Sequence, residues 1–169
     1  WFVYLGFPTG FTLHEDAAGG LPWAASMGPN LADQETGIFW AAFTLFAATT
    51  ASIMSGAVIE RIRVSAFVIL AIVLGAVVWI LGASWGWHPE GWLVTRWGFH
   101  DIGAAGAVHM VSGFFTLGVL INLGPRIGRF NADGTVNEIN GHSMPMSLIG
   151  LMLIVMGFFG FLGGCIIYT

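Results

Sequence analysis

An aspartate and a histidine, Asp101 and His109, stand out in an otherwise apolar part of the sequence. They lie eight residues apart in the stretch FHDIGAAGAVHM. In a helix, eight residues advance the chain by roughly 12 Å and turn it about 80° around the axis. The two side chains therefore cannot touch each other, but both can face the same side of a helix bundle. An ionisable group in so apolar a segment needs a partner or a function.

Each of the two residues has more than one interpretation. Asp101 stands directly before the apolar run and could cap a helix by accepting hydrogen bonds from its first amides. It could also fix a negative potential beside a path for cations. His109 could bond to a neighbouring helix, ligate haem or a metal ion, or line a pore and offer a ring nitrogen to a small substrate.

Three aromatic residues could also contribute to a site. Trp87 lies in the loop sequence SWGWHPEGWL, where it is either one member of an interfacial belt or an aromatic face for a cation. Phe46 and Phe161 lie inside apolar runs, where aromatic rings usually pack and only a defined pore would make them gates. The other histidines lie in loops and are expected to be mostly solvated: His14, His88, His100 and His142.

The composition of the 169-residue chain indicates that lipid rather than water surrounds it. The chain is 56% hydrophobic and 8% charged, whereas an ordinary soluble domain carries roughly 25% charged residues. Its 25 glycines and 8 tryptophans fit close helix contacts and membrane interfaces. The net charge of -4, with only five basic residues, is unlike a nucleic-acid-binding surface, so no nucleic acid partner is expected.

Four long apolar runs are predicted to cross the membrane as helices. They lie at about 38–59, 64–84, 103–124 and 146–168. Each is close to the roughly 20 residues that span a bilayer core as a helix, and none alternates as a strand would. A partial further span is expected near 1–13, followed by a polar loop at 14–37. The segments together are predicted to form a single incomplete transmembrane domain over 1–169.

The arginines predict how the spans are oriented. Four of them lie in the loops after the first and third spans: Arg61, Arg63, Arg126 and Arg129. The fifth, Arg96, lies in the Trp-rich loop between the second and third spans. The positive-inside rule therefore places the loops after the first and third spans on the cytoplasmic-equivalent side and the Trp-rich loop on the outer side.

Patterns typical of enzymes and of metal sites do not occur in the sequence. It contains no Ser-His-Asp, paired-carboxylate, HExxH or phosphate-loop pattern. The single cysteine, Cys165, excludes an internal disulfide and a cysteine-rich metal site. We therefore expect no enzyme, no cofactor and no metal. The chain begins at Trp1 without a signal-peptide pattern, and we expect a processed product or a fragment.

Six motifs together suggest a family. They are SGAVIERIRVSAF at 55–67, WGWHPEGWL at 85–93, DIGAAGAVHMVSG at 101–113, GPRIGRF at 124–130, GHSMP at 141–145 and GFFGFLGG at 157–164. In order, spacing and loop placement they resemble the ammonium transporter (Amt/MEP/Rh) family, and the Amt branch more than the Rh branch. The resemblance implies an all-α integral membrane protein, a polytopic helix bundle that is part of an eleven-span fold with two inverted halves.

The resemblance also implies roles for the residues singled out above. Trp87 is similar to the tryptophan that stacks on incoming ammonium at the pore mouth. Asp101 is similar to the aspartate that supports this recruitment site through structure and field. Phe46 and Phe161 are similar to the two stacked rings that gate the pore. His109 is similar to the first of two bridged histidines in the hydrophobic pore.

Several positions depart from the family pattern. Where the family usually has Phe-Ala-Gly after the aspartate, this chain has IGA at 102–104. Where the family has Gly-Phe-Asn, this chain has GFL at 160–162. A second mouth aromatic falls at Ala42, and the serine that completes the mouth falls at Cys165, whose thiol replaces a hydroxyl donor poorly. We expect a weakened recruitment site. The family's first span and the half with the second histidine have no counterpart in these 169 residues, so this chain is not expected to close a pore alone.

The resulting hypothesis is transport of ammonium or ammonia across a membrane through a hydrophobic pore, with histidine-assisted deprotonation. The alternative is a transport-inactive Amt-like subunit with a structural or sensory role, and a haem-binding four-helix module is a third candidate. The expected partners are ammonium or ammonia and the lipid bilayer. From the resemblance we also expect the chain to form a homotrimer or to be a subunit of a larger membrane assembly.

Overall fold

A computed structural model describes residues 2–20 and 34–167, and within these ranges the chain is helical with no β-strand. The α-helices are α1 (Phe2–Gly6), α3 (Gln34–Val58), α4 (Val64–Val73), α5 (Trp79–Gly86), α6 (Trp92–Trp97), α7 (Val111–Leu123) and α8 (Met144–Ile167). A 3₁₀ segment, η1, covers Glu15–Gly20, and two π-helical segments, η2 and η3, cover Leu74–Val78 and Ala105–Met110. The predicted all-α class is confirmed.

Four helices of the described ranges are long and apolar enough to cross a membrane. They cover Gly37–Val58, Val64–Gly86, Ala105–Leu123 and Met144–Gly164. Each overlaps one of the four runs that the sequence predicts as spans. Two of them are composite, because α4, η2 and α5 form one continuous helix and η3 continues directly into α7. A helix satisfies its own backbone hydrogen bonds, which is what a chain in lipid requires.

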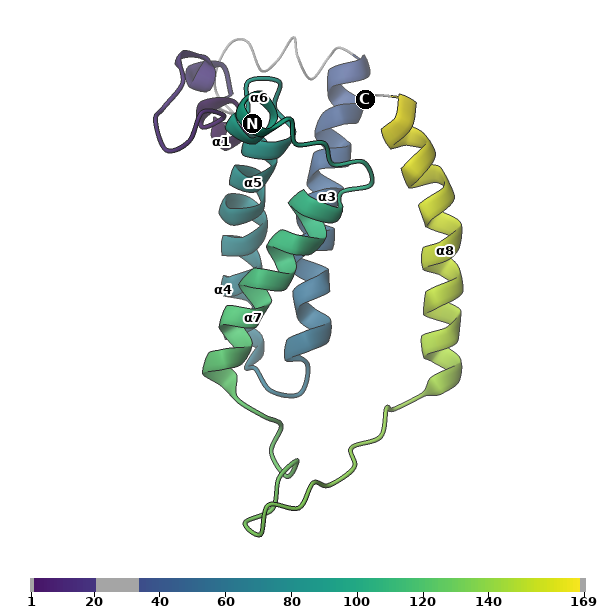
Figure 1. The fold of residues 1–169 in the computed structure, drawn as a ribbon. Coiled ribbons are helices and arrows are strands. Elements are labelled where there is room, and N and C mark those ends of the chain that lie inside the picture. Colours follow the sequence, from purple (N-terminus) through teal and green to yellow (C-terminus); the bar gives the residue numbers. More distant parts are fainter. Residues whose placement is uncertain (1, 21–33, 168–169) are drawn as a thin grey trace. The chain divides into compact units, whose positions relative to one another are not determined.

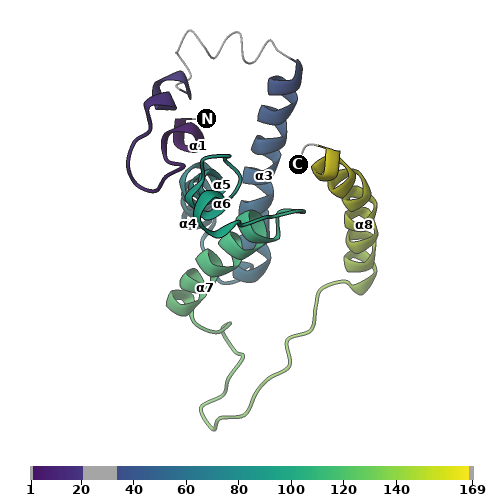
Figure 2. The same ribbon diagram turned by 45° about the horizontal axis from the view of Figure 1, so that its top comes forward.

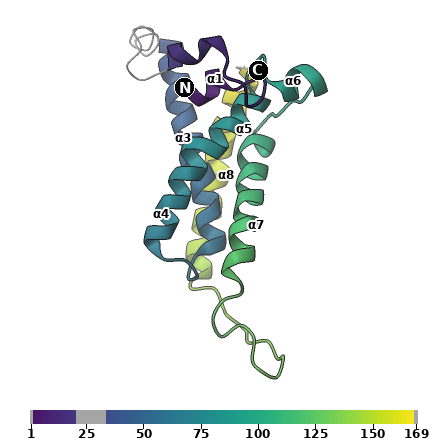
Figure 3. The same cartoon turned by 90° about the vertical axis from the view of Figure 1, so that its left-hand side faces the viewer.

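The chain divides into two compact units, residues 1–123 and 124–169. In the first unit, α3 packs against the α4–η2–α5 helix and against the η3–α7 helix, and the three lie side by side (Figures 1 and 3). A Cβ added to Gly75 would lie 3.2 Å from the carbonyl oxygen of Ala47, so the glycine allows α3 to approach η2 closely. A second link is the Ser112 hydroxyl on α7, which donates to the Thr50 carbonyl on α3 at 2.8 Å.

An aliphatic core stabilises the part of this bundle nearer the 59–63 turn. Met54, Val58 and Leu74 form its fully buried centre, each at most 1% exposed. Partly buried apolar side chains from the turn, α4, η2 and α7 surround them: Ile62, Phe67, Leu70, Ala71, Val78, Val111, Phe115, Val119, Leu120 and Leu123. We call Met54, Val58 and Leu74 the aliphatic core.

The opposite end of the first unit is covered by the segment before residue 21. There α1 packs against α5, next to α6, and η1 packs against α1 (Figure 2). The Ser84 hydroxyl donates to the Tyr4 carbonyl at 2.6 Å. The Trp92 amide donates to the Pro8 carbonyl at 2.9 Å. The expected partial span near 1–13 is therefore a five-residue helix, α1, followed by a turn, and residues 21–33 of the predicted polar loop lie outside the described ranges.

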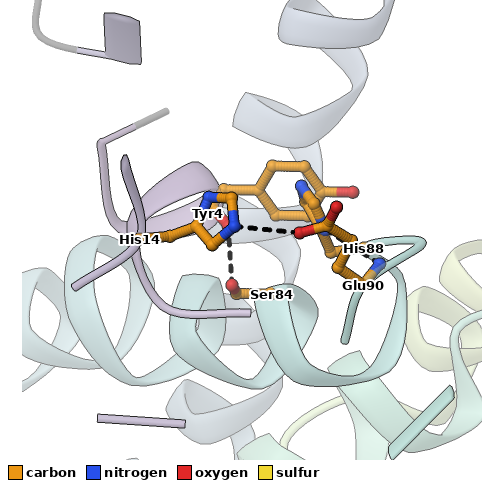
Figure 4. Close-up of polar contacts among 5 residues, drawn as sticks. All are labelled: Tyr4, His14, Ser84, His88 and Glu90. Atoms are coloured by element: carbon orange, nitrogen blue, oxygen red, sulfur yellow. Dashed lines mark hydrogen bonds and ion pairs between the residues drawn. The ribbon is translucent and has the colours of Figure 1, made fainter. Parts of the chain in front are cut away.

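Two of the four loop histidines, a group expected to be mostly solvated, make contacts at this end of the first unit. The imidazole of His14 lies 3.0 Å from the carboxylate of Glu90 (Figure 4). His88 accepts the Glu90 amide at its Nδ1 and packs edge-on against the Tyr4 ring at 5.2 Å. The first turns of the chain are thereby bonded to the loop that contains Trp87. His100 and His142 are exposed, as predicted.

The second unit contains a polar loop and α8. In the loop, Asn131 and Asn137 exchange side-chain hydrogen bonds at 2.8 and 3.0 Å, and the Arg129 guanidinium donates to the Asn137 carbonyl at 2.6 Å. The Ser143 hydroxyl accepts the Met146 amide at 3.5 Å where α8 begins, a position that favours serine. The loop thus has defined turns, and α8 follows as an apolar helix of membrane-spanning length.

Candidate functional site

Four aromatic rings gather in the first unit where α3 meets α5. They belong to Phe43, Phe46, Trp79 and Trp87, and we call them the aromatic cluster. The Phe46 and Trp87 rings lie 5.0 Å apart at 66°, and Phe46 stacks on Trp79 at 6.2 Å and 26°. Phe43 contacts Trp79 at 5.5 Å and Trp87 at 5.8 Å, both edge to face. Ring faces carry the negative part of the aromatic quadrupole, and a cation placed over such a face is attracted to it.

The Asp101 carboxylate connects the aromatic cluster to the helix that carries His109. Its Oδ2 accepts the Trp87 indole N–H at 2.9 Å and the Ala107 amide at 2.8 Å, and its Oδ1 accepts the Gly106 amide at 2.8 Å. The predicted capping of the helix start is therefore present. The bond to Trp87 is an addition that the sequence did not predict, and it fixes the plane of the indole ring.

Local backbone geometry brings this carboxylate onto the helix start. Gly103 and Ala104 both have positive φ, 82° and 60°, so the chain turns back on itself between Asp101 and η3. A Cβ added to Gly106 would lie 2.7 Å from the Phe99 ring and 3.4 Å from the Asp101 carboxylate. Only glycine fits at that distance, so Gly106 allows its own amide to reach Asp101.

His109 lies in the π-helical segment η3, where the sequence predicts a regular α-helix. The amides of Val108 and His109 both donate to the Ala104 carbonyl, at 3.1 and 3.2 Å. Insertions of this kind occur frequently at functional sites. A π turn rotates each residue less than an α turn does, so the angle of about 80° between Asp101 and His109 that an α-helix predicts does not apply. The imidazole is exposed, and the three bonds of Asp101 go elsewhere.

Phe161 and Cys165 both belong to α8 in the second unit. The Phe161 ring packs edge-on against Phe158 at 5.7 Å and 68°. Cys165 lies in the last turns of α8, and its side chain is outside the part that the structure describes. The proposed stacking of Phe161 on Phe46 therefore stays a prediction. Among the described residues, no group of three His, Cys, Asp or Glu side chains could hold a metal ion.

Sequence reasoning missed two members of the aromatic cluster, Phe43 and Trp79. A signal was available for the first, because Phe39, Phe43 and Phe46 are spaced by four and three residues and so lie on one helix face. The rings of Phe39 and Phe43 are indeed 5.2 Å apart. The sequence around Trp79 contains no such pattern, because the residues before and after it are apolar and do not mark one helix face.

A model of the Ammonium Transporter Family matches residues 1–167, almost the whole chain. The chain belongs to the ammonium transporter family. Membership identifies it as an integral membrane protein that crosses the membrane more than once, in agreement with the long apolar helices.

Several curated ammonium transporters are similar to this family member. The chain is 33% identical over 141 residues to Ammonium transporter Amt2 of Archaeoglobus fulgidus, a match that covers 78% of the chain and 30% of that relative. It is 38% identical over 122 residues to Ammonium transporter Amt2 of Methanocaldococcus jannaschii, covering 72% of the chain and 28% of that relative. The putative ammonium transporter sll1017 of Synechocystis is 37% identical over 122 residues, with 72% and 27% covered.

The aligned region is thus less than a third of the length of each of these ammonium transporters. No solved structure matches the chain. The family match supports the assignment of the motifs, and the contacts described above show that one ring of the aromatic cluster, Trp87, is bonded to the Asp101 carboxylate.

Proposed function

We propose that this chain forms the mouth and one wall of a pore through which ammonium is taken up and ammonia crosses the membrane. The observation that carries the proposal is the Asp101 carboxylate, which holds the Trp87 ring beside Phe46 and caps the helix that carries His109. One anionic group thereby joins a surface suited to a cation to the segment with the candidate pore histidine.

The first step is recruitment of the cation. Ammonium loses water when it enters an apolar passage, and losing that hydration is costly unless other groups replace it. The faces of Trp87 and Phe46 attract a cation. Asp101 contributes in two ways, by fixing the Trp87 ring and by adding a negative charge to the field. Its own carboxylate oxygens are already bonded to three donors, so it acts as a positioning residue.

The second step separates the proton from ammonia. A neutral molecule crosses an apolar pore far more cheaply than an ion does. One N–H bond of ammonium breaks, and a ring nitrogen of His109 accepts the proton while neutral ammonia moves on. Imidazole suits this step because its two nitrogens can donate and accept. Phe46 and Phe161 are proposed to gate the passage between the mouth and His109.

Ala42 supports the alternative, a transport-inactive Amt-like subunit with a structural or sensory role. This position on α3 carries a methyl group where a second mouth aromatic is expected, so the cation meets fewer ring faces. The same experiment separates the two proposals, because a sensory subunit would carry no ammonium current. A homotrimer or a larger membrane assembly is the expected setting for either function.

The test is ammonium-evoked current in proteoliposomes that contain the purified native assembly, compared with His109→Ala. His100→Ala is the matched control, because it removes an exposed imidazole just outside the same helix. We expect a current in the native sample and in His100→Ala and a loss in His109→Ala. A folded, correctly inserted native assembly without current would contradict transport and favour the sensory subunit.

A further inference from the structure

The indole of Trp79 is a buried hydrogen-bond donor for which the described part of the chain provides no acceptor. The residue is 1% exposed, and its Nε1 has no partner among the described residues. Buried polar groups in folded proteins are nearly always hydrogen-bonded, and an exception calls for an explanation. Trp79 is also central to the aromatic cluster, since its ring contacts Phe43, Phe46 and Trp87.

The other indole of the cluster shows what is unusual about this one. The Trp87 N–H donates to the Asp101 carboxylate at 2.9 Å and is fully satisfied. The Trp79 N–H has no such acceptor, and the rings around it offer only π faces. One tryptophan of the pair is therefore bonded to the protein, and the other has a donor without an acceptor among the described residues.

The chemistry of an indole N–H restricts what that molecule is. The group donates and cannot accept, so its ligand must have a lone pair. Ammonium has none, because all of its valence electrons are in N–H bonds. Ammonia has one lone pair on nitrogen, and water has two on oxygen. The ring faces of the cluster favour the cation, whereas the Trp79 donor recognises only the neutral molecule.

We propose that the Trp79 indole N–H donates a hydrogen bond to the lone pair of neutral ammonia. The aromatic cluster would then distinguish ammonia from ammonium. The inference rests on the proposed function, because it assigns the substrate form held at one position of the same cluster. It concerns binding alone, and Trp79 neither takes nor gives up a proton. Burial makes the bond effective, because bulk water does not compete for a donor that solvent does not reach.

The direct test is NMR of the tryptophan indole ¹H–¹⁵N groups in the purified native assembly in nanodiscs. The Trp79 resonance is assigned by its loss in Trp79→Phe, or in Trp79→Tyr if the first variant does not fold. Total ammonium chloride is held constant while the pH is raised toward the pKa of ammonium, with potassium chloride in a parallel series. We expect a downfield, saturable shift of the Trp79 proton that follows the ammonia concentration and is absent in potassium chloride.

Other outcomes of this titration overturn the proposal. A shift that follows the ammonium concentration would show that the cation binds. A resonance that is already downfield and does not respond would show a resident water only. An upfield resonance that does not respond would show an N–H···π contact with a neighbouring ring.

Transport provides a second and separate measurement. Trp79→Phe keeps an aromatic ring and removes the donor, and Trp92→Phe, in α6 outside the cluster, is the matched control. We expect the saturating ammonium current to fall roughly two- to tenfold in Trp79→Phe, the fold-change that one neutral hydrogen bond produces, and to be unchanged in Trp92→Phe. Equal currents in native protein and Trp79→Phe would contradict a role for the donor. Absence of current in the native assembly would overturn the proposed function instead, while the NMR titration still decides the ammonia site.

Discussion

The two buried centres of the first unit differ in chemistry although they share the same helices. The aliphatic core consists of Met54, Val58 and Leu74 and contains no ring and no hydrogen-bonding side chain. The aromatic cluster contains four aromatic side chains, one indole bonded to Asp101 and one indole without an acceptor in the described ranges. A centre that only holds helices together does not need polar groups, whereas their presence in the other centre is costly without a function.

From this difference we expect substitutions in the aliphatic core to affect stability alone and substitutions in the aromatic cluster to affect function as well. In the aliphatic core the contribution of a side chain is its volume and its contacts. In the aromatic cluster it is also the direction of a donor or of a ring face. Variants of the two centres should therefore separate into two classes when stability and ammonium current are measured together.

The largest effect is expected for Asp101→Ala, which removes the acceptor of three hydrogen bonds. The Trp87 indole and the amides of Gly106 and Ala107 are then left without their partner. We expect the free energy of unfolding to fall by roughly 3–5 kcal/mol and the ammonium current to disappear. Thermal unfolding and current are measured on the same preparation.

The control for this variant is Asp133→Ala, which removes an exposed carboxylate in the second unit. It should leave the current unchanged. Native-like stability in Asp101→Ala would mean that the carboxylate does not organise the helix start, and the link between the two parts of the site would be lost.

Leu74→Ala is expected to have the next largest effect. The side chain is 0% exposed at the centre of the aliphatic core, and truncation leaves a cavity. The free energy of unfolding should fall by about 2–4 kcal/mol. Ile72→Ala on the same helix is the control, because Ile72 is 62% exposed, and its effect should stay within about 0.5 kcal/mol. Equal losses in both variants would show that the aliphatic core is not the stabilising centre.

Ser112→Ala tests the hydrogen bond that joins α3 to α7 close to both centres. The hydroxyl donates to the Thr50 carbonyl at 2.8 Å and is fully buried. Interhelical bonds of this type contribute about 1 kcal/mol in membrane proteins, so we expect a loss of that size in thermal unfolding. Ser147→Ala is the matched control, since the Ser147 hydroxyl donates to the Ser143 carbonyl directly before its own helix and so joins no two helices. A loss in Ser147→Ala as large as that in Ser112→Ala would contradict the link.

The smallest effect is a pH dependence of the polar loop in the second unit, which belongs to neither centre. The hydroxyl and the amide of Thr135 both donate to the Asp133 carboxylate, and these bonds hold the pKa of Asp133 below its usual value of 3.8. Because the folded pKa is the lower one, the bonds stabilise the turn above the unfolded pKa. This stabilisation is lost as the pH falls through the folded pKa.

The measurement for the loop is the Thr135 amide resonance followed by NMR from neutral to acidic pH. We expect it to move as Asp133 becomes protonated and to stay still in Asp133→Asn. Movement of the Thr135 amide resonance over the same acid range in Asp133→Asn would contradict the assignment of the pH dependence to Asp133.

The sequence predicts the helices well because a run of about 20 apolar residues has few other stable states in lipid. It also predicts Asp101 as a helix cap, since a carboxylate directly before an apolar run has free amides within reach. The family assignment follows from the order of six motifs and is confirmed by the family model.

Other features depend on three-dimensional contacts that no local pattern encodes. The π-helical segments at Leu74–Val78 and Ala105–Met110 coincide with the close contacts of Gly75 and Gly106, and a periodicity of 3.6 residues does not reveal them. The pairing of His14 with Glu90 joins residues 76 positions apart. That the Trp79 indole has no acceptor among the described residues is likewise visible only in three dimensions.

The most direct test of the central claim is the ammonium current per reconstituted assembly in Trp87→Leu and Leu74→Ala, measured side by side in proteoliposomes. The first variant removes a ring face and the donor to Asp101 from the aromatic cluster, and the second removes volume from the aliphatic core. We expect the current to be lost in Trp87→Leu and retained in correctly folded Leu74→Ala. Retention of the current in folded Trp87→Leu would contradict the division between a functional aromatic centre and a structural aliphatic one.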